Sequence, residues 1–140
     1  MAENKTATFQ MFKSVTKMLK TLNLTTYLCN RPKETPSKMN EFAVVDIPVT
    51  IDRTCIGNDD YRYITSCVIY LFVRAKNDGT PNIDKQTSLV RKVCEVFPYK
   101  DEICECVNPV VRLRGFDDLG FQFTTITFTL RTKINSITNL

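Results

Sequence analysis

The run Tyr61–Lys76, "YRYITSCVIYLFVRAK", constrains the fold most, because it is apolar on both of its alternating faces. Successive side chains of a strand point to opposite sides, so residues of one parity share a face. The two faces are Cys67, Ile69, Leu71 and Val73 on one side, and Val68, Tyr70 and Phe72 on the other. Such a strand lies centrally in a sheet with both faces covered. Either helices cover both faces, or another subunit covers one of them.

Two helices are predicted, one before this strand in the sequence and one after it. Residues 8–22 and residues 82–97 both repeat apolar side chains at helical spacing. Thr80 is expected as the N-cap of the second helix, with Pro81 at its first helical position. Pro98 ends that helix, because proline lacks the N–H that a further turn needs.

The remaining chain reads as short strands and polar connections, and no internal repeat divides it. Strands are expected at about 24–29, 41–49, 103–114 and 121–134. Residues 31–40 contain two prolines among polar residues and predict a loop. With 140 residues, 43% of them apolar, the chain can form one domain, residues 1–140, with a real core. The expected fold is α+β: a mixed or antiparallel sheet of about four to five strands with two main helices.

The last strand contains the stretch Gly120–Thr132, "GFQFTTITFTLRT", whose alternation slips by one residue. Phe121 and Phe123 have one parity, whereas Ile126 and the apolar residues after it have the other. The slip predicts a β-bulge at Thr124-Thr125. Threonines at 125, 127 and 129 share a face. That face suits either a subunit interface or the solvent side of an antiparallel sheet.

The residues of most catalytic sites are missing. The sequence has no histidine, only four glycines, and neither of the glycine-rich motifs that bind nucleotide phosphates. The carboxylate pairs Asp59-Asp60 and Asp117-Asp118 lie in predicted turns, where aspartate is common for backbone reasons. We therefore expect no enzyme activity and no cofactor.

Six cysteines raise the question of metal binding or disulfides. Cys104 and Cys106 occupy alternate positions of a strand, so both side chains point to one face and could reach one ion. Structural zinc needs four ligands, however, and the sequence has no second cysteine pair at suitable spacing. The N-terminus has no apolar segment typical of a signal peptide, which favours folding in a reducing cytosol. The cysteines are predicted to be unpaired core residues. No apolar run approaches the ~18 residues that span a membrane.

Three local patterns in this order resemble one protein family. The long strand ends "YLFVRAKNDGTPN", the following helix closes on "VFP", and the final strand opens "DDLGFQFTTITFTLRT". Together with the N-terminal helix, this order resembles the tail terminator (tail completion) and neck connector proteins of tailed bacteriophages. The resemblance covers about residues 8–134. It implies a small α+β subunit that forms a ring, usually hexameric, at the joint between head and tail.

The resemblance also implies partners and a location. The partners are other copies of the chain, neighbouring portal, connector and tail proteins, and the DNA that passes through the ring channel. The location is the tail or neck of a virion assembled in the host cytoplasm, with no membrane. The residues then expected at the subunit interface are those of the two-faced strand and the last strand: Tyr61, Tyr63, Tyr70, Phe72, Thr125, Thr127 and Thr129.

Arg112 and Arg114 share a strand face and are candidates for contact with DNA or a partner, or are solvated surface residues. A second hypothesis is a single-stranded nucleic-acid or RNA binding module. In it Tyr61, Tyr63 and Phe116 stack on bases beside Arg62, Arg112 and Arg114. A third is a cysteine–metal protein. The net charge of +4 is too small to decide among them.

Overall fold

The structure is a computed structural model. It describes residues 7–28, 40–47, 52–53, 63–102, 104–116 and 120–132. The elements in chain order are α1 (Ala7–Leu19), the 3-10 turn η1 (Lys20–Leu22), β1 (Thr26–Leu28), β2 (Glu41–Asp46), β3 (Asp52–Arg53), β4 (Tyr63–Arg74), α2 (Ile83–Glu95), β5 (Tyr99–Lys100), β6 (Cys104–Phe116) and β7 (Phe121–Thr132). The expected α+β class and its two main helices are confirmed. The expected loop at 31–40 lies outside the described residues apart from Asn40.

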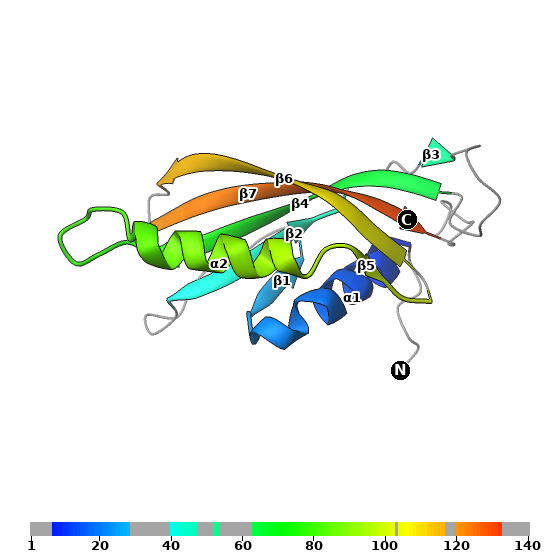
Figure 1. The fold of residues 1–140 in the computed structure, drawn as a ribbon, viewed down its shortest axis with the longest axis horizontal. Helices are drawn as coiled ribbons and strands as arrows, with labels where there is room; N and C mark the ends of the chain where they lie inside the picture. The colour runs from blue at the N-terminus through cyan, green and yellow to red at the C-terminus, as the bar shows by residue number, and fades with distance from the viewer. Residues whose placement is uncertain are drawn as a thin grey trace.

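The strands form one mixed, curled sheet in the order β1-β2-β4-β7-β6-β5, with β3 also paired to β4 (Figure 1). Its seven strands exceed the expected four to five, because β3 and β5 add two-residue strands that the sequence pattern is too short to indicate. β1 pairs parallel with β2, whereas the other pairings are antiparallel. The long strand predicted at 61–76 is β4, which lies centrally between β2 and β7.

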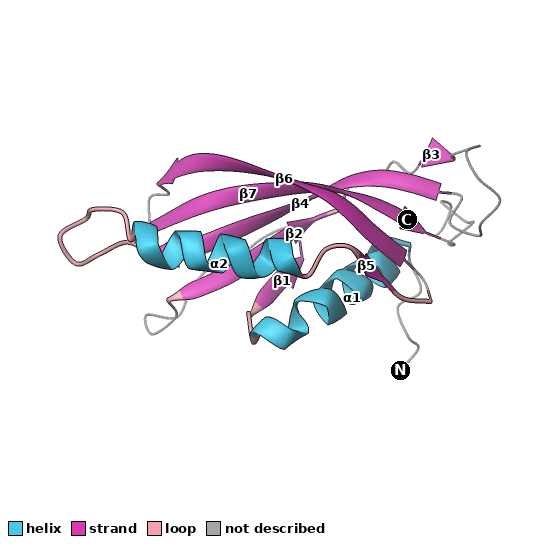
Figure 2. Cartoon of the chain, in the orientation of Figure 1, coloured by secondary structure: helices cyan, strands magenta, loops and turns pink. Residues whose placement is uncertain are grey.

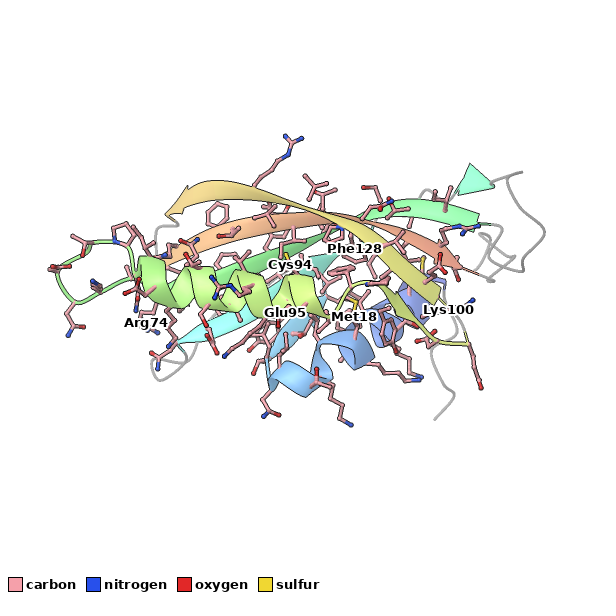
Figure 3. The ribbon with its side chains drawn as sticks, in the orientation of Figure 1. Met18, Arg74, Cys94, Glu95, Lys100 and Phe128 are labelled. Atoms are coloured by element: carbon pink, nitrogen blue, oxygen red, sulfur yellow. The ribbon has the colours of Figure 1, made fainter. Side chains whose placement is uncertain are left out.

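Both helices lie on the same side of the sheet (Figure 2). Their apolar faces pack against the β4 side chains that share a face with Cys67. Together these residues form the main core. Met18 of α1 and Phe128 of β7 are both in this layer, and both are fully buried or nearly so (Figure 3). In the part of the chain that the structure describes, no helix covers the opposite face. Of the two arrangements open for the two-faced strand, a helix layer on each side is therefore wrong for the described residues.

We call the side of the sheet opposite the helices the outer face. At one end of it, aromatic side chains form a second, smaller cluster. Phe42 and Phe121 are buried there, and Tyr27 and Phe72 pack against them. The rings of Phe42 and Phe72 stack with their centroids 4.7 Å apart, and Phe123 lies 5.5 Å from Phe72. This cluster, which we call the aromatic cluster, covers one end of the outer face with residues of the same chain.

The predicted bulge in the last strand is wrong. β7 pairs with β4 in unbroken register from Tyr63–Thr132 to Arg74–Phe121. The parity of Phe121 and Phe123 differs from that of the later apolar residues because the two groups belong to different cores. The phenylalanines join the aromatic cluster on the outer face, whereas the later residues Ile126, Phe128 and Leu130 face the helices.

The positions on the helix side of β7 that hold no apolar residue instead anchor α2. Gln122 is 3% exposed and Thr124 is fully buried. The Gln122 side chain accepts a hydrogen bond from the backbone N–H of Asn82 at 2.5 Å, and its amide donates to Gln86 Oε1 at 2.6 Å. The Gln86 amide in turn donates to the hydroxyl of Thr124. The buried Gln122 and Thr124 side chains therefore have hydrogen-bond partners, which offsets the cost of burying polar groups.

Register shifts occur instead in β6, between Val107 and Val110 and again between Leu113 and Phe116. At the first shift Asn108 has a φ of 58°, a left-handed conformation that asparagine tolerates better than most residues. The extra residue reverses which parity of β6 faces the helices. Cys104 and Cys106 face the core before the shift, whereas Val110 and Arg112 face outward after it.

The ends of the second helix differ slightly from expectation. Its N-cap is Asn82, whose side chain accepts a hydrogen bond from the N–H of Lys85, so Thr80 and Pro81 precede the helix. Thr80 instead closes a turn, because its N–H and hydroxyl both donate to the carboxylate of Asp78. Among the described residues, neither helix has the length and apolar character needed to cross a lipid bilayer.

Candidate functional site on the outer face of the sheet

Three adjacent strands bring six side chains together on the outer face, in two rows. Cross-strand pairing places Tyr70 of β4 opposite Thr125 of β7, and Thr125 opposite Arg112 of β6. The second row is formed in the same way by Val68, Thr127 and Val110. Residues paired across antiparallel strands lie within contact distance of one another, so the two rows form one continuous surface.

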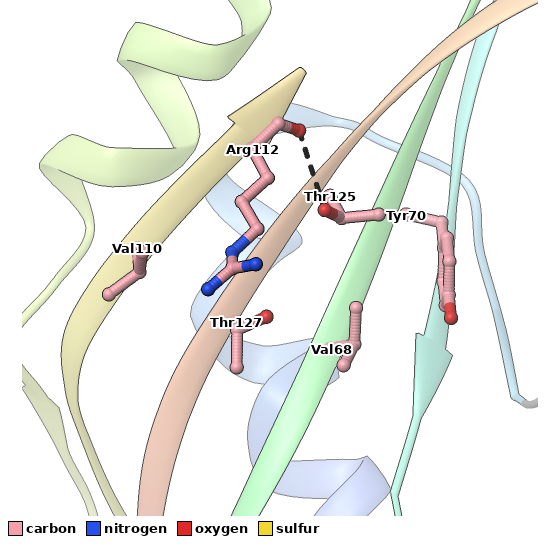
Figure 4. Close-up of a pocket in the computed structure, with 6 residues that line it drawn as sticks. All are labelled: Val68, Tyr70, Val110, Arg112, Thr125 and Thr127. Atoms are coloured by element: carbon pink, nitrogen blue, oxygen red, sulfur yellow. Dashed lines mark hydrogen bonds between the residues drawn. The ribbon is translucent and has the colours of Figure 1, made fainter. Parts of the chain in front are cut away.

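This surface is slightly concave and open. The six residues line a hollow of about 260 Å³ (Figure 4). Its floor is Thr125, which is 4% exposed and whose hydroxyl donates to the backbone carbonyl of Arg112 at 3.4 Å. Val110 is 51% exposed, and the Arg112 side chain is exposed as well. We call this group of residues the hollow.

The hollow has apolar walls and one cation. Valine methyl groups, threonine methyl groups and the ring of Tyr70 supply its apolar surface, and the hydroxyls and the Arg112 guanidinium can hydrogen-bond. None of its six described lining residues has a carboxylate, imidazole or thiol that could act as acid, base or nucleophile. Such a mixture, with an aromatic residue and an arginine among aliphatic ones, is typical of contact surfaces between proteins.

Two features border the hollow. Toward the start of β7 lies the aromatic cluster, which includes Phe72 and Tyr70 among its half-buried members. Toward the other end lies an ion pair across β6 and β7, in which Arg131 donates to Glu105 at 3.2 Å. Both side chains of the pair are about one fifth exposed. The described outer face therefore passes from packed rings, through the open hollow, to a salt-bridged polar end.

The structure brings together four of the residues that the sequence singled out. Tyr70, Thr125, Thr127 and Arg112 all line the hollow. Thr129 lies on the same face in the next row of β7, paired with Ser66 and Val107. Phe72 is on this face too, but it packs within the subunit in the aromatic cluster.

The side chains of the other candidates lie outside the described part of the structure. Tyr63 and Arg114 belong to β4 and β6, but their side chains are not among those described. Tyr61 and Arg62 lie outside the described residues, and so does the side chain of Phe116. The carboxylate pairs at 59–60 and 117–118 are also outside.

Sequence reasoning missed the two valines of the hollow. Val68 could have been found, because it shares the parity of Tyr70 in an unbroken strand. Val110 could not have been found by parity, because counting from Cys104 and Cys106 places it on the helix side. The only local signal is Asn108-Pro109, where a residue that tolerates positive φ precedes one that has no N–H to donate.

Buried thiols form the other group of reactive residues. The described cysteines Cys67, Cys94, Cys104 and Cys106 are unpaired, and all but Cys94 are fully buried. Cys29 and Cys55, to which the same prediction applies, lie outside the described residues. Burial raises the pKa of the Cys104 thiol to about 11, against the opposing effect of hydrogen bonds with Ser14 and Thr132. Burial also raises the pKa values of Cys67 and Cys106 well above the ordinary value. Within the described ranges, no three ligand-type side chains are placed to hold a metal ion.

Comparisons with known proteins support the fold. No protein-family model matches the chain, and no curated protein matches it either. Ten chains of solved structures do match. One of them, a protein of unknown function, aligns over 94% of this chain and 99% of its own with a TM-score of 0.58 and 11% sequence identity. At that identity the likeness concerns the fold alone: the arrangement of helices and strands recurs over nearly the whole length of another protein.

Proposed function

We propose that this chain is a structural virion protein of a tailed bacteriophage. In this proposal it forms an oligomeric ring at the head–tail joint, as a tail terminator, tail completion or neck connector subunit. The proposal rests on the family resemblance of the sequence and on one structural observation. Both helices lie on one side of a central strand that is apolar on both sides, which leaves the hollow without a described cover.

The uncovered side has a physical cost in an isolated subunit. Val110 keeps about half of its surface in water, and Val68, Tyr70 and Thr127 are only half-buried. Burying apolar surface contributes roughly 25 cal/mol per Å², so covering this group would favour association. A second copy of the chain is the cover that a ring requires.

The chemistry of the hollow supports a role in assembly. Threonine side chains on a sheet surface can hydrogen-bond across an interface while their methyl groups pack. Tyr70 offers a large rigid surface with a polar end, and the Arg112 guanidinium can pair with carboxylates or carbonyls of a neighbour. We propose that neighbouring portal, connector and tail proteins contact the ring, and that DNA passes through its channel.

Purified protein tests the proposal. Sedimentation velocity should find a closed oligomer, consistent with six copies, and negative-stain electron microscopy should find rings with a central opening. The rings should persist in 0.5 M NaCl, because apolar burial resists screening whereas exposed ion pairs do not. A monomer at every concentration up to those used for microscopy would contradict the proposal.

A second candidate is a single-stranded nucleic-acid or RNA binding module. The observation that favours it is the exposed Arg112 in the same row as the ring of Tyr70. Aromatic rings that stack on bases beside cations that contact phosphates form such sites. Titration with a fluorescent oligonucleotide at several salt concentrations separates the candidates. A nucleic-acid module predicts tight binding that weakens steeply with salt and is lost in Arg112→Ala.

A further inference from the structure

β6 has an open side along most of its length. β5 pairs with it only at Glu105 and Cys106. β6 then continues to Phe116. In the described part of the chain, no strand pairs with the edge of Val107–Phe116 that points away from β7. An open strand edge presents backbone N–H and C=O groups to which another strand can add.

The exposed part of this edge is apolar on both faces. Three large apolar residues are exposed among those described, and two of them, Val110 at 51% and Val111 at 40%, are neighbours here. Successive strand residues point to opposite faces, so an added strand would meet a valine on either side. The register from Val110 to Leu113 is regular, because the shifts lie before and after it. This regular stretch of apolar edge is what strand addition requires.

The other end of the same sheet is the three-residue strand β1, close in length to the regular stretch Val110–Leu113. β1 comprises Thr26–Leu28 and pairs with β2, and the described part of the chain places no strand beyond it. β1 and the part of β6 that β5 leaves unpaired are therefore two different edges of one subunit. A ring needs two different surfaces that mate head-to-tail from one copy to the next.

The strand directions are compatible with such a junction. β6 is antiparallel to β7, β7 to β4, and β4 to β2, while β1 is parallel to β2. β1 and β6 therefore run in opposite directions. Rotation about an axis roughly along the strands preserves the direction of each strand in every copy. In a ring of that geometry, β6 of one copy is antiparallel to β1 of the next, the commoner and slightly more stable pairing.

We infer that Val110–Leu113 of one copy pairs antiparallel with Thr26–Leu28 of the next copy, which joins the subunit sheets edge to edge around the ring. This inference rests on the proposed ring. It also connects the edge with the hollow, because Val110 and Arg112 belong to both. The added β1 therefore lies beside Val110 and Arg112, at the β6 border of the hollow.

The first test places a charge on the edge. Val111→Lys puts an ammonium group beside the strand that is added, while Thr87→Lys puts the same group on the exposed surface of α2. Sedimentation velocity should give at least a tenfold rise in the dissociation constant for Val111→Lys and no change for Thr87→Lys. Circular dichroism of both variants checks that the subunit stays folded. Equal assembly by a folded Val111→Lys overturns the inference.

The second test identifies the partner strand by crosslinking. Arg112→Cys and Thr25→Cys are prepared as separate proteins, mixed, allowed to exchange subunits and treated with a short thiol-reactive crosslinker. Both parent residues are exposed, and Thr25 adjoins β1. Wild-type protein gives the background from the native cysteines. The inference predicts a linked dimer that forms only when both variants are present.

The remaining outcomes each decide something different. Linkage of Arg112→Cys to itself would mean that two β6 edges pair about a two-fold axis, and it overturns the inference. A ring that forms normally but gives no linked product overturns the junction and leaves the proposed function intact. If wild-type protein forms no oligomer, the proposed function and the junction fail together.

Discussion

Gln122 in β7 and Asn82, forty residues earlier, hold each other through two hydrogen bonds. The Asn82 N–H donates to Gln122 Oε1, and Gln122 Nε2 donates to the Asn82 carbonyl at 3.3 Å. Asn82 is also the N-cap of α2, so one side chain on the sheet fixes the point at which the helix begins. The contact anchors the start of α2 on the side of the sheet opposite the hollow.

Replacing this glutamine should destabilise the subunit. In Gln122→Ala, the Asn82 N–H and the Gln86 side chain lose a buried partner, which costs roughly 1–3 kcal/mol. Thr129→Ala is the control, since Thr129 is half-buried on the outer face of the same strand. Urea unfolding should show a clear decrease in the free energy of unfolding for Gln122→Ala and a change within about 0.5 kcal/mol for Thr129→Ala. Similar losses in both variants would contradict the anchoring role.

This contact also explains where sequence reasoning failed. The bulge inferred from the parity slip at Thr124-Thr125 was wrong, because the positions of β7 that face α2 at this end hold Gln122 and Thr124 instead of apolar residues. The partners of Gln122 lie 36 and 40 residues away in the chain, so no local pattern indicates them. The Asn82 cap was missed for the related reason that Thr80-Pro81 has the better local signal.

Features that depend on local periodicity were predicted correctly. The two helices, the central strand and the shared core face of Cys104 and Cys106 follow from residue spacing alone. The hollow itself was not predicted, but Tyr70, Thr125 and Thr127 lie on the strand faces where parity places them. Val110 depends on the register shift at Asn108, which reverses the faces of β6, and residues 104–112 give only a weak signal of that shift.

Phe72 should be more important for folding than for assembly. It was a candidate interface residue, but its ring stacks on Phe42 and contacts Phe123. Phe72→Asp would bury a carboxylate beside these rings at a cost of several kcal/mol. Val110→Asp carries the same charge on a side chain that is half exposed.

Thermal unfolding followed by circular dichroism compares these two variants. Phe72→Asp should unfold at a much lower temperature than wild type or fail to fold. Val110→Asp should keep a folded subunit that assembles poorly. A fully folded Phe72→Asp that stays monomeric would assign Phe72 to the interface instead.

The buried thiol of Cys104 should make stability depend on alkaline pH. Its pKa is raised from 9.0 to about 11 in the folded protein, so between these values the folded state holds a proton that the unfolded state has lost. The contribution of this thiol to the free energy of unfolding is fully present below pH 9 and is lost as the pH rises toward 11. The Cys104→Ala variant lacks this loss.

Urea unfolding at several pH values measures the effect. Within this window, the free energy of unfolding of wild type should fall relative to that of Cys104→Ala by up to ~1.4 kcal/mol per pH unit. Parallel curves for the two proteins from pH 8 to pH 11 would show that Cys104 is not protected by burial.

The most direct test of the account is the assembly state of Thr127→Arg, set against the matched variant Thr87→Arg. Thr127 lies in the hollow between Val68 and Val110, whereas Thr87 is exposed on α2. An arginine at 127 fills the hollow and adds a second cation beside Arg112, so it should prevent close approach of another subunit. Sedimentation velocity should find Thr127→Arg as a folded monomer and Thr87→Arg as the same closed oligomer that wild type forms. A Thr127→Arg protein that still forms the wild-type oligomer would contradict the claim that the outer face of the sheet is a contact between subunits.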